Sequence, residues 1–131
     1  MRHHLDEGLP TGLAMNAVAA LSLSVGKFVD GIVGDDVKDG DCRPHTGITA
    51  IPLPVLKGDT AAMREIVLKA ATLTDVFVVD FTAIAQSSRG CDEYTRRTAE
   101  VPTAELPYVG VAVCGPKAAV NRLTGSLPLY R

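Results

Sequence analysis

The chain has 131 residues, enough for one domain with a hydrophobic core, and 47% of them are hydrophobic. Tryptophan is absent and aromatic residues make up only 5%, so aliphatic side chains and alanine must fill that core. The formal charge is −2 and the lysines and arginines form no block, which argues against a nucleic-acid-binding surface.

Cysteine usage and hydropathy indicate a soluble cytoplasmic protein. Cys42, Cys91 and Cys114 form an odd set without close spacing, which is typical of free thiols in a reducing compartment. The first seven residues contain no apolar run of the kind found in signal peptides. The apolar segment 13–25 is interrupted by polar residues and is too short to span a bilayer. We therefore expect no association with membranes.

The first third of the chain predicts a helix followed by a polar loop. A helix is expected over 12–25, with Thr11 as N-cap and Gly26 as its end. A short strand is expected over 27–33, and the acidic segment 34–41 reads as a polar loop or hairpin. The small and aliphatic residues at helical spacing on the first helix, which predict its packed face, are Ala14, Ala17, Val18, Leu21 and Val25.

The middle of the chain predicts a strand and a second helix. Pro52 and Pro54 remove hydrogen-bond donors from the extended run 48–56, so this run should lie at a sheet edge or approach the sheet irregularly. A helix is then expected to about Leu73, capped by Asp59 or Thr60.

The last part predicts the strongest strands of the sequence. The apolar run 75–80 should be a strand covered on both faces, with Asp80 at its C-terminal end. A short charged helix is expected over 91–98. A strand over 109–114 then leads through Pro116 into a helix that stops at Gly125. This order of elements predicts an α/β fold with a small sheet between layers of helices.

Three stretches in this order resemble type 2 peptidyl-tRNA hydrolases: residues 9–20, Val76–Asp80 and Tyr108–Leu129. A closer likeness, through 9–12, 49–56 and 80–82, is to the bacterial domain of unknown function 2000 family, which is similar in fold and has no assigned reaction. The resemblance implies one domain over 1–131, with a three-layer α/β/α architecture and a small mixed sheet. It also implies a homodimer.

The hydrolase pattern is incomplete here. Leu13 stands where the hydrolases carry a lysine, Ala17 where they carry a glutamine and Ala20 where they carry a histidine. Of the polar set only Asp80 is kept, with Gln86 available if the loop after it shifts in register. Without the lysine, nothing obvious stabilises an oxyanion, so peptidyl-tRNA hydrolysis is not expected.

The N-terminus also departs from related chains. Only Met1 to Leu5 precede the first turn, and His3 and His4 replace apolar residues. We expect a stunted first strand. The alternatives are a misplaced start and completion of the sheet by another chain.

The resemblance and the position of Asp80 predict a cleft at the end of its strand. Asp80 would act as a general base that activates water, or it would brace the following loop. His45 would shuttle protons, or it would be a solvated loop residue. The residues expected to line the cleft and bind the substrate are Thr82 and Gln86 on one side, and Thr11, Gly12 and Asn16 on the other.

Metal and interface hypotheses have weaker support. Cys42 and His45 have the spacing of half a zinc site, but no second close pair exists. The acidic loop 34–41 lacks the terminal glutamate of a calcium loop. The charged run 92–97 is most simply a solvated helix face, in which Tyr94 could cover the cleft and the arginines could serve a subunit interface. We expect neither a metal nor a cofactor.

The leading functional hypothesis is a protein that binds a small or acylated substrate, with divergent hydrolase chemistry at Asp80. The competing hypothesis is a non-catalytic homodimeric module that binds or regulates a partner. A true peptidyl-tRNA hydrolase is the third hypothesis.

Overall fold

The computed structural model describes residues 1–125 and 127–130. Its main feature is a mixed four-stranded sheet in the order β4-β1-β6-β5, in which β1 runs parallel to β4 and antiparallel to β6. β5 also runs antiparallel to β6. The strands are β1 (Arg2–Asp6), β4 (Val55–Gly58), β5 (Phe77–Thr82) and β6 (Tyr108–Cys114).

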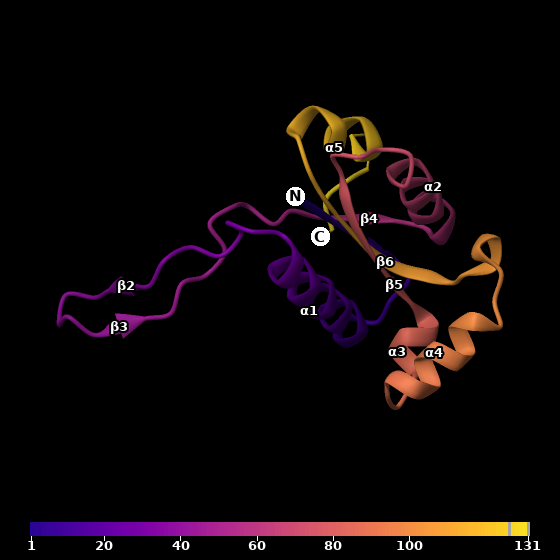
Figure 1. Ribbon diagram of the computed structural model, residues 1–131, viewed down its shortest axis with the longest axis horizontal. Helices are drawn as coiled ribbons and strands as arrows, with labels where there is room; N and C mark the ends of the chain where they lie inside the picture. The colour runs from indigo at the N-terminus through magenta and orange to yellow at the C-terminus, as the bar shows by residue number, and fades with distance from the viewer. Residues whose placement is uncertain (126, 131) are drawn as a thin grey trace.

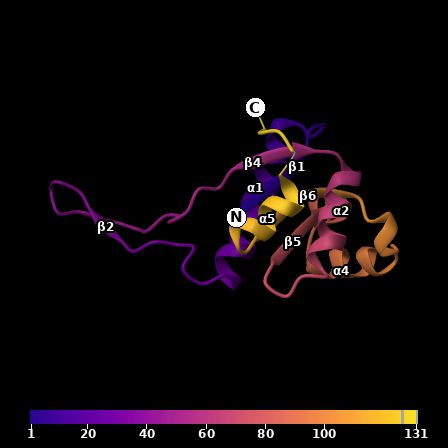
Figure 2. The same ribbon diagram turned by 90° about the horizontal axis from the view of Figure 1, so that it is seen from above.

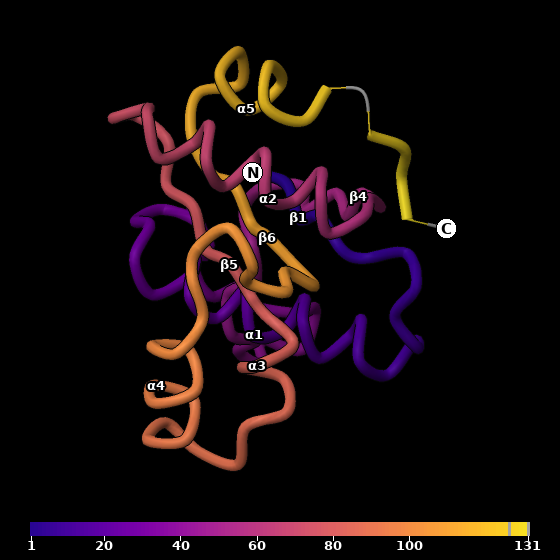
Figure 3. Tube along the Cα trace, turned by 90° about the vertical axis from the view of Figure 1, so that its right-hand side faces the viewer, coloured from indigo at the N-terminus to yellow at the C-terminus, as the bar shows by residue number. Residues whose placement is uncertain are grey.

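Helices cover both faces of this sheet, as Figure 3 shows from the side. One face carries α1 and the other carries α2 and α5, so the expected α/β fold with a mixed sheet between helices is confirmed. The helices that cover the sheet are α1 (Thr11–Phe28), α2 (Thr60–Ala70) and α5 (Lys117–Thr124). Within the described residues, no helix has both the length and the apolarity to cross a membrane.

The sheet divides the core into two parts. The α1-side core consists of Leu5, Ala14, Ala17, Leu21, Val25, Ile32 and Ala112. The α2-side core consists of Met63, Ile66, Tyr108, Val111, Val113 and Val120. Strand β6 contributes to both parts because its side chains alternate between the two faces. The small residues of α1 allow that helix to lie close to the sheet, as its sequence pattern predicted.

The first strand is not stunted. β1 occupies a central position between β4 and β6, and His3 and His4 are both 0% exposed. The N–H of His3 donates to the carbonyl of Pro54 at 3.0 Å. Strand pairing on both sides therefore secures β1 despite its two polar residues.

The first helix is longer than expected. It begins at Thr11 itself, after Pro10, and runs through Gly26 to Phe28, so Thr11 is not an N-cap and Gly26 does not end the helix. Gly26 is exposed, and a glycine inside a helix costs only about 1 kcal/mol. The predicted strand over 27–33 is consequently wrong, and the chain turns at Gly31, which has a φ of 74°.

The second helix and the strand after it were predicted more closely. Asp59 caps α2 through a 2.7 Å bond from the N–H of Ala62, as expected, although α2 ends at Ala70. β5 extends to Thr82 and lies at an edge of the sheet, where every side chain except Thr82 is at most partly covered, so the expected cover on both faces is not found. A short helix that the sequence did not predict, α3 (Ala83–Ser87), follows directly.

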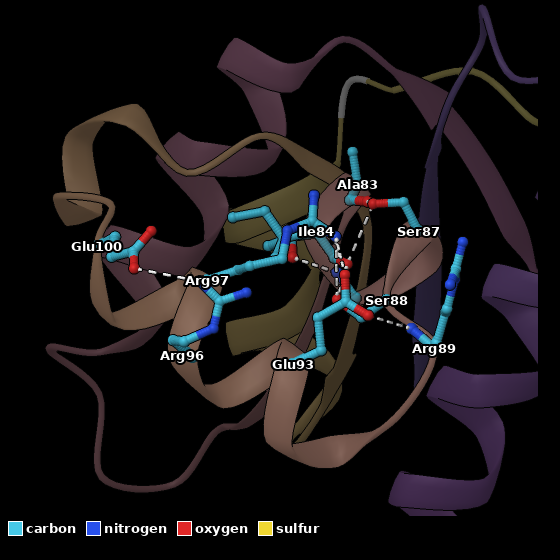
Figure 4. A network of polar contacts seen from close by, with 11 residues as sticks. Ala83, Ile84, Ser87, Ser88, Arg89, Glu93, Arg96, Arg97 and Glu100 are labelled. Atoms are coloured by element: carbon cyan, nitrogen blue, oxygen red, sulfur yellow. Dashed lines mark hydrogen bonds and ion pairs between the residues drawn. The ribbon is translucent and has the colours of Figure 1, made fainter.

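Helix α4 (Cys91–Ala99) has no buried residue and is held by polar contacts (Figure 4). Arg97 Nη1 lies 3.2 Å from Ser88 Oγ and 3.5 Å from Glu93 Oε1. The N–H of Arg89 donates to Glu93 Oε2 at 3.0 Å. The predicted short charged helix is confirmed, and its charged side chains stabilise the turn between α3 and α4 through these hydrogen bonds.

Residues 33–50 form a long hairpin, called the arm here, which extends away from the sheet (Figures 1 and 2). It contains the short strands β2 (Val37–Lys38) and β3 (Pro44–His45), which pair with one another. The predicted polar loop or hairpin is confirmed, but its projection from the body was not foreseen.

The C-terminal segment closes the fold along β4. A 3-10 turn, η1 (Thr103–Glu105), precedes β6, and α5 follows it as expected. Gly125 has a φ of −65°, so the left-handed stop predicted there is absent. The N–H of Tyr130 donates to the carbonyl of Val55 at 2.9 Å, which pairs the tail with the outer edge of β4.

Candidate functional site

Asp80 and the start of α1, which the predicted cleft brings together, lie on opposite faces of the sheet. Val79 and Phe81 pack against the α1-side core, whereas Val78 packs against the α2-side core. Because side chains alternate along a strand, Asp80 points to the α2 face, away from α1. The expected arrangement of Asp80 beside the start of α1 is therefore not found.

The position of Asp80 along the sheet separates it further from that helix start. Gly110 is paired with Phe81, and a Cβ atom at Gly110 would lie 3.1 Å from Leu21 Cδ1. This end of β5 is thus level with the middle of α1. Leu21 is about 15 Å along the helix from Thr11.

Asp80 instead borders a hollow of about 380 Å³ at the free edge of β5. Desolvation by the surrounding residues raises the pKa of the Asp80 carboxyl above its usual value, although the side chain still reaches the surface. Burial and the charge of Asp80 together raise the pKa of Tyr108, which Arg64 partly opposes. The other residues lining the hollow are Ser24, Phe28, Phe77, Val78, Val79 and Tyr94. Tyr94 therefore does border the space beside Asp80, but none of these described residues is a histidine, lysine or cysteine that could exchange a proton with it.

Thr82 and Gln86 are engaged by the backbone. Thr82 is 1% exposed, and its hydroxyl oxygen accepts from the N–H of Ala85 at 3.2 Å, capping α3. Gln86 Nε2 donates to the carbonyl of Leu13 at 3.0 Å. Gln86 is thus brought to the start of α1, as predicted, but both side chains already have structural partners.

His45 lies in β3 on the arm, which projects away from the sheet (Figure 2). Its Nε2 is 3.2 Å from Asp39 Oδ2, and both residues are exposed. Among the described residues, no group of three or more histidines, cysteines, aspartates and glutamates could hold a metal ion. Cys42 and His45 therefore gain no further ligands for the zinc site considered above.

The start of α1 borders an apolar groove of about 420 Å³. Thr11 lines it, whereas Asn16 and Gly12 are exposed and do not. No side chain caps α1, so the N–H groups of its first turn remain available to a ligand. The residues that line the groove are Leu5, Thr11, Ala14, Met15, Val18, Ala19, Val55 and Tyr130.

Most of this groove was not predicted from the sequence. Met15 and Val18 lie one turn apart on α1, and Met15 is 68% exposed, so an apolar residue outside the packed face was an available signal. Tyr130 had no such signal, because only the pairing of the tail with β4 places it there.

A comparison with known protein families shows to which family this chain belongs. The sequence model of a family described as a protein of unknown function, DUF2000, matches residues 4–131. The chain belongs to the DUF2000 family. No curated protein matches it.

A solved structure supports the fold of this DUF2000 protein. It is described as a protein of unknown function, Atu0240, from Agrobacterium tumefaciens strain C58. The TM-score is 0.87 at 17% sequence identity, over 99% of this chain and 96% of the other. At that identity the likeness concerns the fold alone, and the likeness to peptidyl-tRNA hydrolases stays a prediction.

In this DUF2000 protein, two features could serve a ligand, and they differ in chemistry. The hollow at β5 offers one carboxylate, Asp80, with the hydroxyl-bearing Ser24 and Tyr94 in the same lining and no histidine, lysine or cysteine. The groove at α1 offers apolar walls with free backbone donors at one end. The second combination can bind a molecule that has an apolar part and an anionic or carbonyl head.

Proposed function

We propose that this DUF2000 protein is a binding module for a small molecule with an apolar, acyl-like chain. The observation that carries the proposal is the composition of the α1 groove, whose walls are aliphatic except for Thr11 and Tyr130. Ligand pockets of soluble proteins are typically apolar with a few polar groups that orient the ligand. A volume of about 420 Å³ accommodates an acyl chain of moderate length.

The head of the ligand would lie at the first turn of α1. Thr11 borders the groove at that end, and its hydroxyl and the uncapped N–H groups can bind a carboxylate or carbonyl oxygen. The positive end of the helix dipole favours an anion there by about 0.3–1 kcal/mol at an exposed site.

The same geometry favours binding without catalysis. The groove lining contains no carboxylate, imidazole, ammonium or thiol. Asp80 lies across the sheet, and Thr82 and Gln86 are engaged by backbone groups. Hydrolysis centred on Asp80 would take place in the separate hollow at β5, away from the groove that holds the acyl chain, so it is not part of the proposal.

Titration with sodium decanoate, followed by thermal unfolding, tests the proposal. A ligand that binds only the folded state at about 100 times its Kd raises the unfolding free energy by about 2.7 kcal/mol. We expect decanoate to raise the midpoint in a concentration-dependent way, and decanol to bind more weakly because it lacks the anionic head.

Two variants on the same helix locate the binding site. Met15→Glu places a charge in the groove and should abolish the decanoate shift. Leu23→Glu is the matched control, because Leu23 is 77% exposed on α1 outside the groove. An unchanged midpoint of the wild type at millimolar decanoate, or an equal loss in both variants, would contradict the proposal.

A further inference from the structure

The two edges of the sheet end differently. Along β4 the C-terminal tail is extended, and the N–H of Lys57 donates to the carbonyl of Pro128 at 2.9 Å. β5 forms the opposite edge and pairs with β6 on its inner side. Within the described residues, no backbone bridge reaches the outer side of β5. The chain therefore covers one edge of its sheet and leaves the other open.

Pairing across the sheet shows which way the backbone groups of each strand point. The N–H of His3 donates to the carbonyl of Pro54, so the backbone of His3 is directed towards β4. This direction alternates along a strand, so the backbone of His4 is directed towards β6, where His4 is paired with Val111. The next residue of β6, Ala112, is then directed towards β5.

Two residues of β5 consequently direct their backbone outward. Ala112 is paired with Val79, so the N–H and carbonyl of Val79 face β6. The N–H and carbonyl groups of Val78 and Asp80 point to the open edge, and no hydrogen bond from the described part of the chain reaches them. An extended backbone beside β5 would supply the matching donors and acceptors at the spacing of a strand.

β5 lacks the features that usually keep an edge strand unpaired. Natural edge strands are commonly short, or contain proline, lysine or a bulge. β5 has six residues, with neither proline nor lysine, and its register shifts only at its end, between Phe81 and Thr82. Its single charged residue is Asp80. An open edge of this kind is suited to receive a further strand.

Apolar and acidic side chains border the open edge. The hollow beside β5 shares Phe28 and Phe77 with a second hollow of about 460 Å³, and Phe28 is 64% exposed. Neither lining contains a lysine or an arginine, and Lys27, whose Nζ is 5.1 Å from the centroid of the Phe28 ring, lies outside both. The carboxylates in the two linings are Asp30, Asp75 and Asp80. The edge therefore favours a partner that is both apolar and basic.

The two faces of β5 offer different contacts to a neighbouring strand. Phe77 and Val79 point to the α1 face, whereas Val78 and Asp80 point to the α2 face. The side chains of an added strand would alternate between the same two faces. Those on the α1 face would meet the rings of Phe28 and Phe77, whose centroids are 6.1 Å apart. Those on the α2 face would meet the carboxylate of Asp80.

We propose that the open edge of β5 binds an extended peptide segment of a partner protein, in which basic and apolar side chains alternate. The backbone of the segment bonds to Val78 and Asp80 and extends the sheet by one strand. Its apolar side chains pack on Phe28 and Phe77, and its basic side chains lie beside Asp80. The edge shares no residue with the lining of the α1 groove, so this interaction is independent of the acyl ligand.

Three fluorescently labelled octapeptides test the proposal. In the first, lysine and valine alternate; the second replaces each lysine by glutamate; the third has the composition of the first, with lysines and valines in separate blocks. We expect fluorescence anisotropy to show binding of the first alone, because the second repels the carboxylates and the third lacks the two-residue period of a strand. Absence of binding at millimolar protein, or equal binding of the first peptide and either control, would overturn the proposal.

Amide hydrogen exchange shows whether the peptide pairs with the backbone of β5. The N–H groups of Val78 and Asp80 should exchange freely in the protein alone and become protected when the lysine–valine peptide is bound. The N–H of Val79, which faces β6, should be protected in both states. Binding without new protection at Val78 and Asp80 contradicts strand addition. Protection of these two groups in the protein alone also contradicts it, and a doubled mass would then identify a second copy as the occupant.

Reversal of the charge at the edge tests the specificity. Asp80→Lys should weaken binding of the lysine–valine peptide about tenfold and strengthen binding of the glutamate peptide. Asp41→Lys is the matched control, because it makes the same change of net charge at an exposed position on the arm, and it should change either affinity less than about twofold. Equal effects of the two substitutions, or an unchanged preference in Asp80→Lys, would overturn the proposal.

Val78→Pro tests the role of the backbone. It removes an N–H that points away from β6, a position at which an edge strand tolerates proline, so the chain should fold and keep its circular dichroism spectrum. Loss of this donor should weaken binding of the lysine–valine peptide about fivefold or more. A folded Val78→Pro variant with the affinity of the wild type would show that the peptide does not pair with β5.

Discussion

The body and the arm of this protein are specified in different ways. In the body, a Cβ atom at Gly110 would meet Leu21 Cδ1 at 3.1 Å and Leu5 Cδ2 at 3.2 Å, which are ends of side chains that can yield. In the arm, a Cβ atom at Gly47 would meet backbone at 1.8 Å. At these two positions, side chains limit the space in the body and backbone limits it in the arm, where aspartate side chains also accept hydrogen bonds from the backbone.

The body and the arm therefore differ in how much their contacts contribute to stability, although both have a defined conformation. Burial of apolar area stabilises the sheet and its helices by about 25 cal/mol per Å². The arm has well-defined hydrogen bonds, but it buries little apolar area, and an exposed hydrogen bond contributes little net free energy. The four predictions below test the contrast, from the largest expected effect to the smallest.

Truncation in the core should give the largest loss of stability. Leu21 is 1% exposed in the α1-side core, so Leu21→Ala should lower the free energy of unfolding by about 2–5 kcal/mol. Leu23→Ala, on the same helix at 77% exposure, should change it by less than about 0.5 kcal/mol. Urea unfolding of both variants measures the contrast, and equal losses would show that α1 does not pack on the sheet as described.

Acid should weaken the body through His4. Burial, with smaller contributions from Arg2 and His3, lowers the pKa of His4 to about 4 from 6.5. Between these values the unfolded chain binds the proton and the folded chain does not, so stability falls as the pH drops from about 6.5 to about 4, by about 3 kcal/mol in all.

The variant His4→Leu should remove that part of the pH dependence. Neither ring nitrogen of His4 has a partner among the described residues, so replacement also removes an unsatisfied buried polar group. Urea unfolding at several pH values should give the wild type the steeper loss below pH 6.5. Parallel curves for the two proteins would show that His4 is not buried in the folded state.

Loss of the α3 cap should give a smaller effect. Thr82 accepts a hydrogen bond from the N–H of Ala85, so Thr82→Ala should lower the free energy of unfolding by about 1 kcal/mol. Thr82→Ser keeps the hydroxyl and is the matched control. Equal losses in the serine and alanine variants would argue that the methyl group, not the cap, matters.

A change within the arm should leave the unfolding of the body almost unaltered. Hydrogen bonds from the backbone of Arg43 and from His45 lower the pKa of Asp39, which organises the tip. Asp39→Ala should therefore speed amide hydrogen exchange over 34–48. It should leave the midpoint of thermal unfolding, measured at low protein concentration, unchanged. A clear fall of that midpoint would show that the arm supports the body after all.

The sequence by itself determined most of the elements of the body. Helical spacing on α1, the cap Asp59 on α2 and the apolar runs of β5 and β6 are local signals, and each element formed close to its expected place. Local signals failed for β1, because its place in the sheet depends on the strands with which it pairs. The strand that contains His3 and His4 looked weak, yet pairing with β4 and β6 buries it.

Only the tertiary structure decided which polar and apolar groups meet. The face to which Asp80 points depends on the alternation of β5 against β6, and its level against α1 depends on the register of those strands. The α1 groove likewise requires Tyr130, which the tail brings to β4 from the far end of the chain. Contacts between residues distant in sequence depend on the register of the strands and on where the tail packs against the sheet. Local sequence patterns specify neither of these.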